Sequence, residues 1–200
     1  MPPQTHPPTA DPSARVPVRI RRLGTYERAV AGVDDLLARL HRHRGDDGPG
    51  ASGLADLLPM TTLSGIDAGA ALLADMVERG RPILVVGDYD ADGATGTAVA
   101  LLGLRGLGAA RVEHLTPSRF RHGYGLSPPV VDAAAEHRPG LIVTVDNGIA
   151  SLTGVERANA LGIPVLVTDH HLPGPELPPA AAIVNPNQPG CPFASKHIAG

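Results

Sequence analysis

Aromatic residues are scarce in this chain, which has two phenylalanines, three tyrosines and no tryptophan among 200 residues. A core must therefore be built from aliphatic side chains, and a hydrophobic content of 42% is enough for one sizeable core. There is a single cysteine, Cys191. One cysteine excludes an internal disulfide framework and fits a reducing compartment, so we expect a cytoplasmic location.

Long apolar runs are missing as well. No run reaches the ~18 residues that a membrane-spanning helix needs, and the amino-terminal segment lacks the apolar region of a signal peptide, so no membrane association is expected. The formal net charge of −3 argues against a general nucleic-acid coat protein. Residues 1–44 nevertheless hold eight arginines against four acidic residues. This segment is either a contact for a polyanion or a solvated helix face.

Composition divides the chain into three parts. Residues 1–16 are rich in proline and polar residues, which is typical of a flexible tail. Residues 17–51 are predicted to form a helical segment, with apolar residues at helical spacing over 25–44, and to run into a glycine-rich linker. Residues 52–200 are predicted to form the main domain.

Strand-like and helical patterns alternate in the main domain. Stretches typical of strands occur at 82–87, 111–117, 141–148, 163–171 and 181–185, and the first of them is a short continuous apolar run. Helical patterns lie at 66–80, 94–108, 127–137 and 151–162. This alternation predicts the α/β class, with a parallel sheet covered by helices on both faces.

Three of the predicted strands end in ionisable side chains: Asp88, Asp90 and Asp92; Asp146; and Asp169, His170 and His171. In an open parallel sheet, ligands bind outside the carboxyl ends of the strands. So many carboxylates at one edge would repel one another unless a cation neutralised them. Carboxylates with one or two histidines suit Mn²⁺, or Mg²⁺ with more water. Two ions ~3.5–4 Å apart could activate a water and hold a phosphoryl group.

The spacing of the first acidic cluster has a simple geometric reading. In an extended chain Asp88, Asp90 and Asp92 would share one face. Gly93 and Gly96 would then allow a tight turn into a helix, whose first N–H groups attract phosphate. Taken singly, an aspartate here is an ordinary helix cap or turn residue. Only the recurrence at equivalent strand ends favours a metal site.

The stretches "GDYDADG", "VDNG" and "TDHH", in this order, resemble motifs I, II and III of the DHH phosphoesterase family. Stretches at 118–127, 184–193 and 195–200 favour the branch of bacterial exonucleases specific for single-stranded DNA over smaller relatives. The resemblance implies a two-metal phosphodiesterase that uses Mn²⁺ or Mg²⁺. It would release mononucleotides from the 5′ end of single-stranded DNA, in DNA repair and recombination.

The resemblance also implies roles for individual residues. Five are expected at the metal site, with Asp88 either a ligand or the support of one: Asp88, Asp90, Asp92, Asp146 and His170. Asp169 would orient the histidine pair, and His171 would face the scissile phosphate. Four side chains are candidates for contact with DNA, by stacking or by phosphate binding: Arg119, Arg121, Tyr124 and Lys196. For Lys196 a solvated side chain is the alternative, and Phe120 and Phe193 could simply fill the core.

The family pattern also includes features that this sequence does not contain. A fourth motif with a further metal-ligating aspartate, a second domain that clamps the substrate and an OB-type domain would all follow residue 200. We therefore expect the DHH domain at 52–200 to be incomplete at its C-terminus and weak in catalysis by itself. Alternatives are a phosphodiesterase for nano-RNA or cyclic dinucleotides, an inorganic pyrophosphatase, or a non-catalytic nucleic-acid-binding remnant. A single-strand-binding protein or a helicase is left open as a partner.

Overall fold

The computed structural model describes residues 32–43, 57–118, 123–196 and 198. The chain divides into two units, Met1–Asp56 and Leu57–Gly200. In the first unit, helix α1 spans Val33–His43 and lies within the predicted helical stretch. The predicted tail and the whole of the predicted linker lie outside the described residues.

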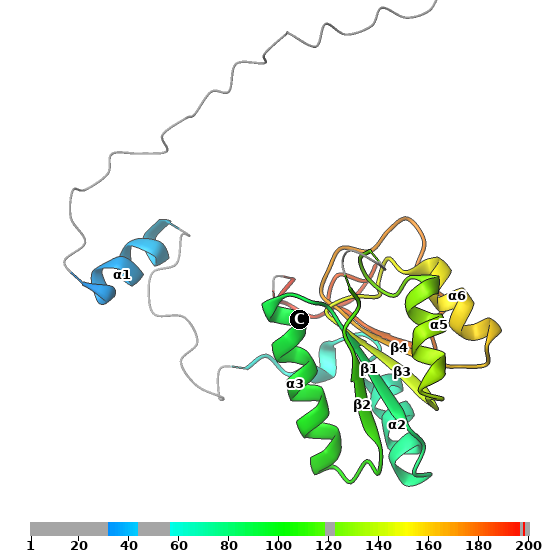
Figure 1. Cartoon of the computed structure of the whole chain (residues 1–200). Coiled ribbons are helices and arrows are strands. Elements are labelled where there is room, and N and C mark those ends of the chain that lie inside the picture. The colour runs from blue at the N-terminus through cyan, green and yellow to red at the C-terminus, as the bar shows by residue number, and fades with distance from the viewer. Residues whose placement is uncertain (1–31, 44–56, 119–122, 197, 199–200) are drawn as a thin grey trace, which may run out of the picture. The chain divides into compact units, whose positions relative to one another are not determined.

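The second unit alternates strands and helices (Figure 1). Its strands are β1 (Ile83–Gly87), β2 (Val112–Leu115), β3 (Leu141–Val145), β4 (Val165–Thr168) and β5 (Ala182–Val184). Its helices are the 3-10 turn η2 (Met60–Thr62), α2 (Ile66–Glu78), α3 (Ala91–Gly106), α5 (Pro128–Glu136) and α6 (Leu152–Ala160). All neighbouring strands pair in parallel, in the order β2-β1-β3-β4-β5. The predicted α/β class with a parallel sheet is confirmed.

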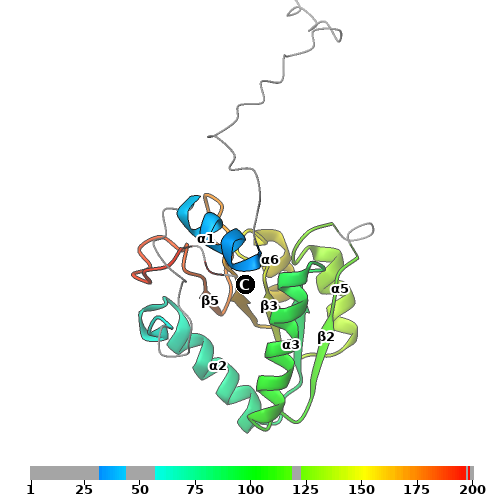
Figure 2. The same ribbon diagram turned by 90° about the vertical axis from the view of Figure 1, so that its left-hand side faces the viewer.

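Helices cover both faces of this sheet, as the strand sequences require. Every residue of β1 and of β3 is buried, and such strands read as continuous apolar runs rather than as alternating ones. On one face, alternate strand residues such as Val85 and Val143 pack against α2 and α3 (Figure 2). On the other face, Val86, Ile142 and Val165 pack against α5 and α6, with Val130 and Val155 at the centre of the contact.

The strand order places a topological switch point between β1 and β3. The chain moves from β1 to β2 on one side and then returns to add β3 on the other side of β1. Ligand sites in open α/β sheets lie at such a switch point, outside the carboxyl ends of the strands. Gly87 pairs with Val145, and Val145 pairs with Thr168. The residues that follow these three, at 88, 146 and 169, therefore leave the sheet side by side.

The chain turns into α3 earlier than the sequence pattern indicated. The helix begins at Ala91, with Asp90 as its N-cap, so Asp92 lies in the first helical turn. The expectation that Asp88, Asp90 and Asp92 share one face of an extended chain is therefore wrong. The reason is that the N-cap aspartate offers its side chain to a free helical N–H, which favours an early helix start.

Two smaller findings complete the fold. Ser151 precedes α6 as its N-cap residue, and its hydroxyl accepts a hydrogen bond from the Leu126 N–H at 3.1 Å, which ties the loop before α5 to α6. Within the described ranges, no helix combines the length and the apolar character needed to cross a bilayer.

Candidate metal centre

Asp146 is the most constrained residue at the carboxyl edge of the sheet. It follows β3 with a φ of 61°, a left-handed conformation that aspartate tolerates better than most residues. Its side chain is 1% exposed, and among the described residues its Oδ2 has no hydrogen-bond partner. Burial, with repulsion from the Asp92 and Asp90 charges, raises the pKa of Asp146 to about 6. A buried carboxylate oxygen without a donor calls for a cation or a proton.

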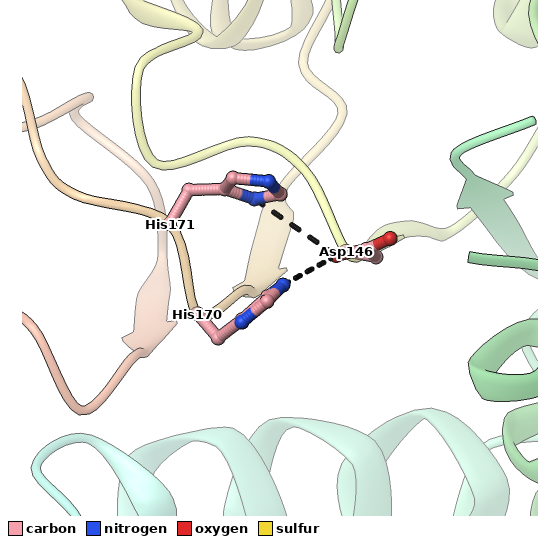
Figure 3. A group of neighbouring side chains, drawn as sticks. All are labelled: Asp146, His170 and His171. Atoms are coloured by element: carbon pink, nitrogen blue, oxygen red, sulfur yellow. Dashed lines mark hydrogen bonds and ion pairs between the residues drawn. The ribbon is translucent and has the colours of Figure 1, made fainter. Parts of the chain in front are cut away.

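The loop after β4 turns two imidazole rings toward Asp146 (Figure 3). Nε2 of His170 lies 2.8 Å from Oδ1 of Asp146 and 3.6 Å from Oδ2 of Asp92. Nδ1 of His171 lies 3.9 Å from the same Asp146 oxygen. One ligand atom from each of Asp146, His170 and His171 falls within 4.8 Å of the others. A carboxylate and imidazoles this close are suitable ligands for a divalent transition metal.

A second group of oxygen ligands surrounds the start of α3. Asp88, Asp90 and Asp146 each offer an oxygen within 4.8 Å of the others. Oδ1 of Asp90 accepts a hydrogen bond from the Gly93 N–H at 2.9 Å, and this bond outweighs partial burial and lowers the pKa of Asp90. The Asp90 carboxylate is therefore charged at neutral pH. Asp146 belongs to both groups and so joins the acids after β1 to the histidines after β4.

Asp169 lies behind the histidine pair, and hydrogen bonds occupy both of its oxygens. Oδ1 accepts from the backbone N–H of His170 at 2.7 Å, from that of His171 at 3.1 Å, and contacts Nδ1 of His171 at 2.7 Å. Oδ2 accepts from the Ile149 N–H at 2.9 Å. A carboxylate whose oxygens are engaged in this way fixes the loop that carries the histidine pair.

The His171 ring lies at the exposed side of the site. Its side chain is 45% exposed. Burial lowers the pKa of His171, but the hydrogen bond to Asp169 and the charges of Asp169, Asp146 and Asp88 prevail and raise it above the ordinary value. Because Nδ1–H donates to Asp169, Nε2 of the neutral ring is left as an acceptor. The side chain therefore gains a proton readily at Nε2.

Tyr124 borders the same side of the site. Its hydroxyl oxygen lies 3.3 Å from each ring nitrogen of His171, and the two rings meet edge to face with centroids 5.9 Å apart. Burial, with the charges of Asp169 and Asp88, raises the pKa of Tyr124, so the hydroxyl stays protonated at neutral pH. The residue is 52% exposed, which leaves ring surface available to a ligand.

Close backbone packing fixes the two acidic turns. A Cβ on Gly93 would lie 2.6 Å from the backbone oxygen of Asp88, so only glycine allows α3 to start this close to the end of β1. The Asn147 side-chain amide donates to the carbonyls of Val86 at 3.0 Å and Val145 at 2.9 Å. These bonds tie the ends of β1 and β3 together, and with them the positions of the acidic turns.

Of the other candidates for contact with DNA, the structure describes only Lys196. Arg119, Arg121 and Phe120 lie outside the described residues. The Lys196 amine donates to the carbonyls of Pro186 at 2.6 Å and Cys191 at 2.8 Å, so it braces the chain after β5. Phe193 is buried, in agreement with the core-filling alternative.

Two asparagines near the site were not singled out from the sequence. Asn185 and Asn187 donate to the backbone carbonyls of His171 and His170, at 3.0 Å and 2.6 Å. The only signal in the sequence was the amide-rich stretch "VNPNQ", which carries no spacing rule that would connect it to a histidine pair 14 residues earlier.

The donor set fits Mn²⁺ or Mg²⁺ better than a thiol-preferring metal. Cys191 is buried, and its sulfur accepts from the Ser64 N–H at 3.4 Å, away from the groups around Asp146. What the edge of the sheet offers is carboxylate oxygen with imidazole nitrogen, and one of those oxygens is buried without a partner among the described residues.

A parallel sheet with carboxylates and imidazoles at this edge defines a protein with a candidate divalent-metal centre, and comparison with known proteins identifies the family. Residues 82–199 match the DHH family, N-terminal domain. The chain belongs to the DHH family, so the resemblance seen in motifs I to III is confirmed.

The relatives are single-stranded-DNA-specific exonucleases named RecJ. The chain is 48% identical over 187 residues to RecJ of Escherichia coli (strain K12), covering 92% of this chain and 32% of that protein. It is 40% identical over 163 residues to RecJ of Bacillus subtilis (strain 168), covering 82% of this chain and 20% of that protein. The chain thus spans about a third or less of the length of these relatives.

Solved structures show the same fold. A crystal structure of exonuclease RecJ bound to manganese matches with a TM-score of 0.61 at 40% identity, covering 67% of this chain and 34% of that chain. RecJ from Thermus thermophilus in complex with Mn²⁺ matches with a TM-score of 0.57 at 36% identity, covering 79% of this chain and 22% of that chain.

Proposed function

We propose that this chain carries part of the active site of a metal-dependent exonuclease that degrades single-stranded DNA from its 5′ end. The observation that carries the proposal is the position of Asp146, which belongs to both groups of ligand atoms and has a buried oxygen without a partner among the described residues. Relatives at 48% and 40% identity are named for this specificity, and a matching RecJ structure holds manganese.

In this proposal two ions of Mn²⁺ or Mg²⁺ bind to five side chains: Asp88, Asp90, Asp92, Asp146 and His170. Such ions lower the pKa of a bound water and neutralise the charge of the phosphate. The sharing of Asp146 between the two ligand groups supports a pair of ions rather than a single one.

The other residues of the site, Asp169, His171 and Tyr124, orient one another and hold a proton near the phosphate. Asp169 holds the His171 ring with Nδ1–H toward itself, which leaves Nε2 beside the Tyr124 hydroxyl. The raised pKa of His171 favours the protonated ring, which would donate a hydrogen bond from Nε2 to a phosphate oxygen beside it. The Tyr124 ring offers a surface on which a base can stack, and its hydroxyl steadies His171.

Arg119 and Arg121 complete the proposal as phosphate contacts. Replacing either arginine with alanine should weaken binding of single-stranded DNA and reduce the salt slope by about one. Arg157→Ala is the matched control, because this arginine lies on α6 and pairs with Asp132 at 2.8 Å. Unchanged affinity and slope in both variants would remove Arg119 and Arg121 from the binding surface.

Metal titration and digestion test the proposed function together. Calorimetry should detect Mn²⁺ binding by the wild-type chain and its loss in Asp146→Asn. Digestion is best followed in a chimera, with this chain in place of the matching third of E. coli RecJ. We expect release of mononucleotides from 5′-labelled single-stranded DNA, and loss of that release in the Asp146→Asn chimera.

The competing functions predict different results in the same assays. A pyrophosphatase would release phosphate from pyrophosphate faster than nucleotides from DNA. A phosphodiesterase for nano-RNA or cyclic dinucleotides would prefer those short substrates. A non-catalytic remnant would bind DNA without Mn²⁺ and hydrolyse nothing.

Cellular context follows from the substrate in this proposal. A nuclease specific for single strands needs another protein to expose them, so we include a helicase or a single-strand-binding protein as partner, in cytoplasmic DNA repair and recombination. The unpaired thiol of Cys191 is consistent with a reducing compartment. In a reconstituted assay, duplex DNA should be degraded only when a helicase and ATP are present.

A further inference from the structure

The histidine pair lies on irregular backbone, so its peptide groups cannot be satisfied by the sheet. β4 ends at Thr168, and the next three residues belong to no helix or strand. Buried backbone N–H and C=O groups need partners. For His170 and His171, side chains supply these partners. Asp169 accepts from both N–H groups, and two asparagines donate to the two carbonyls.

Each asparagine contacts the backbone carbonyl of one histidine of the pair. The Nδ2 group of Asn187 donates to the His170 carbonyl at 2.6 Å, and that of Asn185 donates to the His171 carbonyl at 3.0 Å. Asn185 is 0% exposed, although asparagine is rarely buried completely. We call Asn185 and Asn187 the asparagine clasp.

The clasp is itself held in place by the chain after β5. Oδ1 of Asn185 accepts from the Asn187 N–H at 2.7 Å. The Gln188 amide donates to the carbonyls of Ile183 at 2.9 Å and Asn185 at 3.2 Å. Lys196 braces the same loop through the carbonyls of residues 186 and 191. A donor fixed in this way can fix the group that it contacts.

We propose that Asn185 and Asn187 are positioning residues for the candidate metal centre, with Asn187 acting through His170 and Asn185 through His171. This inference rests on the proposed function of that centre. A metal ligand must be held within about 0.5 Å of its productive position, and backbone freedom at the histidine would exceed this. Loss of a group that orients a ligand typically costs about 10–100-fold in metal affinity or activity.

The two members of the clasp should therefore differ in effect. His170 lies 2.8 Å from the Asp146 oxygen, so loosening its backbone through Asn187 acts on Mn²⁺ affinity. His171 faces the open side, so loosening it through Asn185 acts on turnover. Asn187→Ala is the cleaner variant, because Asn185→Ala also removes the acceptor of the Asn187 N–H.

Mn²⁺ titration of the whole 200-residue chain tests the proposal. Asn187→Ala should weaken Mn²⁺ binding at least about 10-fold. The matched control is Asn159→Ala on α6, which also removes an asparagine amide that donates to a backbone carbonyl, that of Pro179 at 2.8 Å, but no contact with the clasp or with either histidine. Its affinity should stay within about 3-fold of wild type. Wild-type affinity in Asn187→Ala, or equal losses in both variants, would overturn the proposal.

A metal-free measurement separates this inference from the proposed function. The His170 side-chain resonances of the metal-free chain should shift in Asn187→Ala and remain in place in Asn159→Ala. If the wild-type chain binds no Mn²⁺, the proposed function fails, while these shifts still report whether the clasp positions the ring. Absence of a His170 shift would overturn the positioning role. Should Asn187→Ala not fold, Asn187→Ser, whose hydroxyl is too short to reach the carbonyl, is judged by the same criteria.

Discussion

Nε2 of His170 lies 2.8 Å from Oδ1 of Asp146, although the two residues are 24 positions apart in the chain. Both atoms are metal ligands by type, and the pairing of β3 with β4 brings them together. In the metal-free protein a hydrogen bond between these two atoms satisfies both of them. A divalent ion must replace that hydrogen, so Mn²⁺ binding should release protons and strengthen as the pH rises.

Asp146 should make the metal-free protein less stable as the pH rises. Its pKa is raised from 3.8 to about 6 in the folded state, so the folded form holds the proton more tightly than the unfolded chain. The contribution of Asp146 to the free energy of unfolding is fully present below about pH 4 and is lost as the pH rises through about 6. Over this range the free energy of unfolding falls by about 3 kcal/mol. Asp146→Asn removes this dependence.

Urea unfolding of both metal-free proteins between about pH 4 and 7 measures the difference. Carboxylates outside the site contribute equally to both proteins, so the free energy of unfolding of wild type minus that of Asp146→Asn reports Asp146 together with its coupling to Asp90 and Asp92. A difference that stays constant across this range would contradict the raised pKa.

Asp169→Asn should loosen the histidine loop and lower the pKa of His171. An asparagine at this position has one oxygen that accepts and one NH₂ group that only donates. The NH₂ group must face either the Ile149 N–H or the N–H groups of the histidine pair, so a hydrogen bond is lost and two donors are placed against each other. We expect the free energy of unfolding to fall by about 1–3 kcal/mol. The pKa of His171, followed by NMR titration, should fall because a hydrogen bond and a charge are lost.

Asp132→Asn is the control for this substitution, because Asp132 forms an exposed ion pair with Arg157. It should change the free energy of unfolding by less than about 1 kcal/mol. Equal effects of the two substitutions would show that Asp169 has no special place in the loop.

Gly93→Ala should damage the start of α3, whereas Gly103→Ala in the same helix should not. At Gly93 the new Cβ would lie 2.6–2.8 Å from backbone atoms of Asp88. Backbone atoms, unlike the end of a flexible side chain, cannot rotate out of the way. At Gly103 nothing lies within 4 Å. We expect Gly93→Ala to destabilise the protein by about 1–3 kcal/mol and Gly103→Ala to stabilise it by up to about 1 kcal/mol. Thermal unfolding of the two variants checks the opposite signs.

Tyr124 is expected to bind a base through its ring rather than its hydroxyl. Tyr124→Ala should weaken binding of single-stranded DNA by about 1–3 kcal/mol, the usual worth of one stacked base. Tyr124→Phe keeps the ring and should remain within about 3-fold of wild type in fluorescence anisotropy. Equal affinity in all three proteins would exclude stacking on Tyr124.

Much of the fold could be predicted from local patterns, because the runs at 82–87 and 141–148 are apolar for a physical reason. A strand covered on both faces has no solvent side, so its sequence cannot alternate. The start of α3 was placed three residues late, since the pattern of apolar residues does not register an N-cap at Asp90. Strand order was not predictable, because it depends on long-range pairing.

By itself, the sequence determined the class of fold and which aspartates and histidines stand at strand ends, because both depend on residues close together along the chain. Tertiary structure alone decided that Asp146 is shared by the two ligand groups, since this depends on β3 lying between β1 and β4. It also decided that Asn185 and Asn187 hold the histidine carbonyls. Hydrogen bonds from a side chain to distant backbone follow no spacing rule, so only the folded chain shows which peptide group each amide meets.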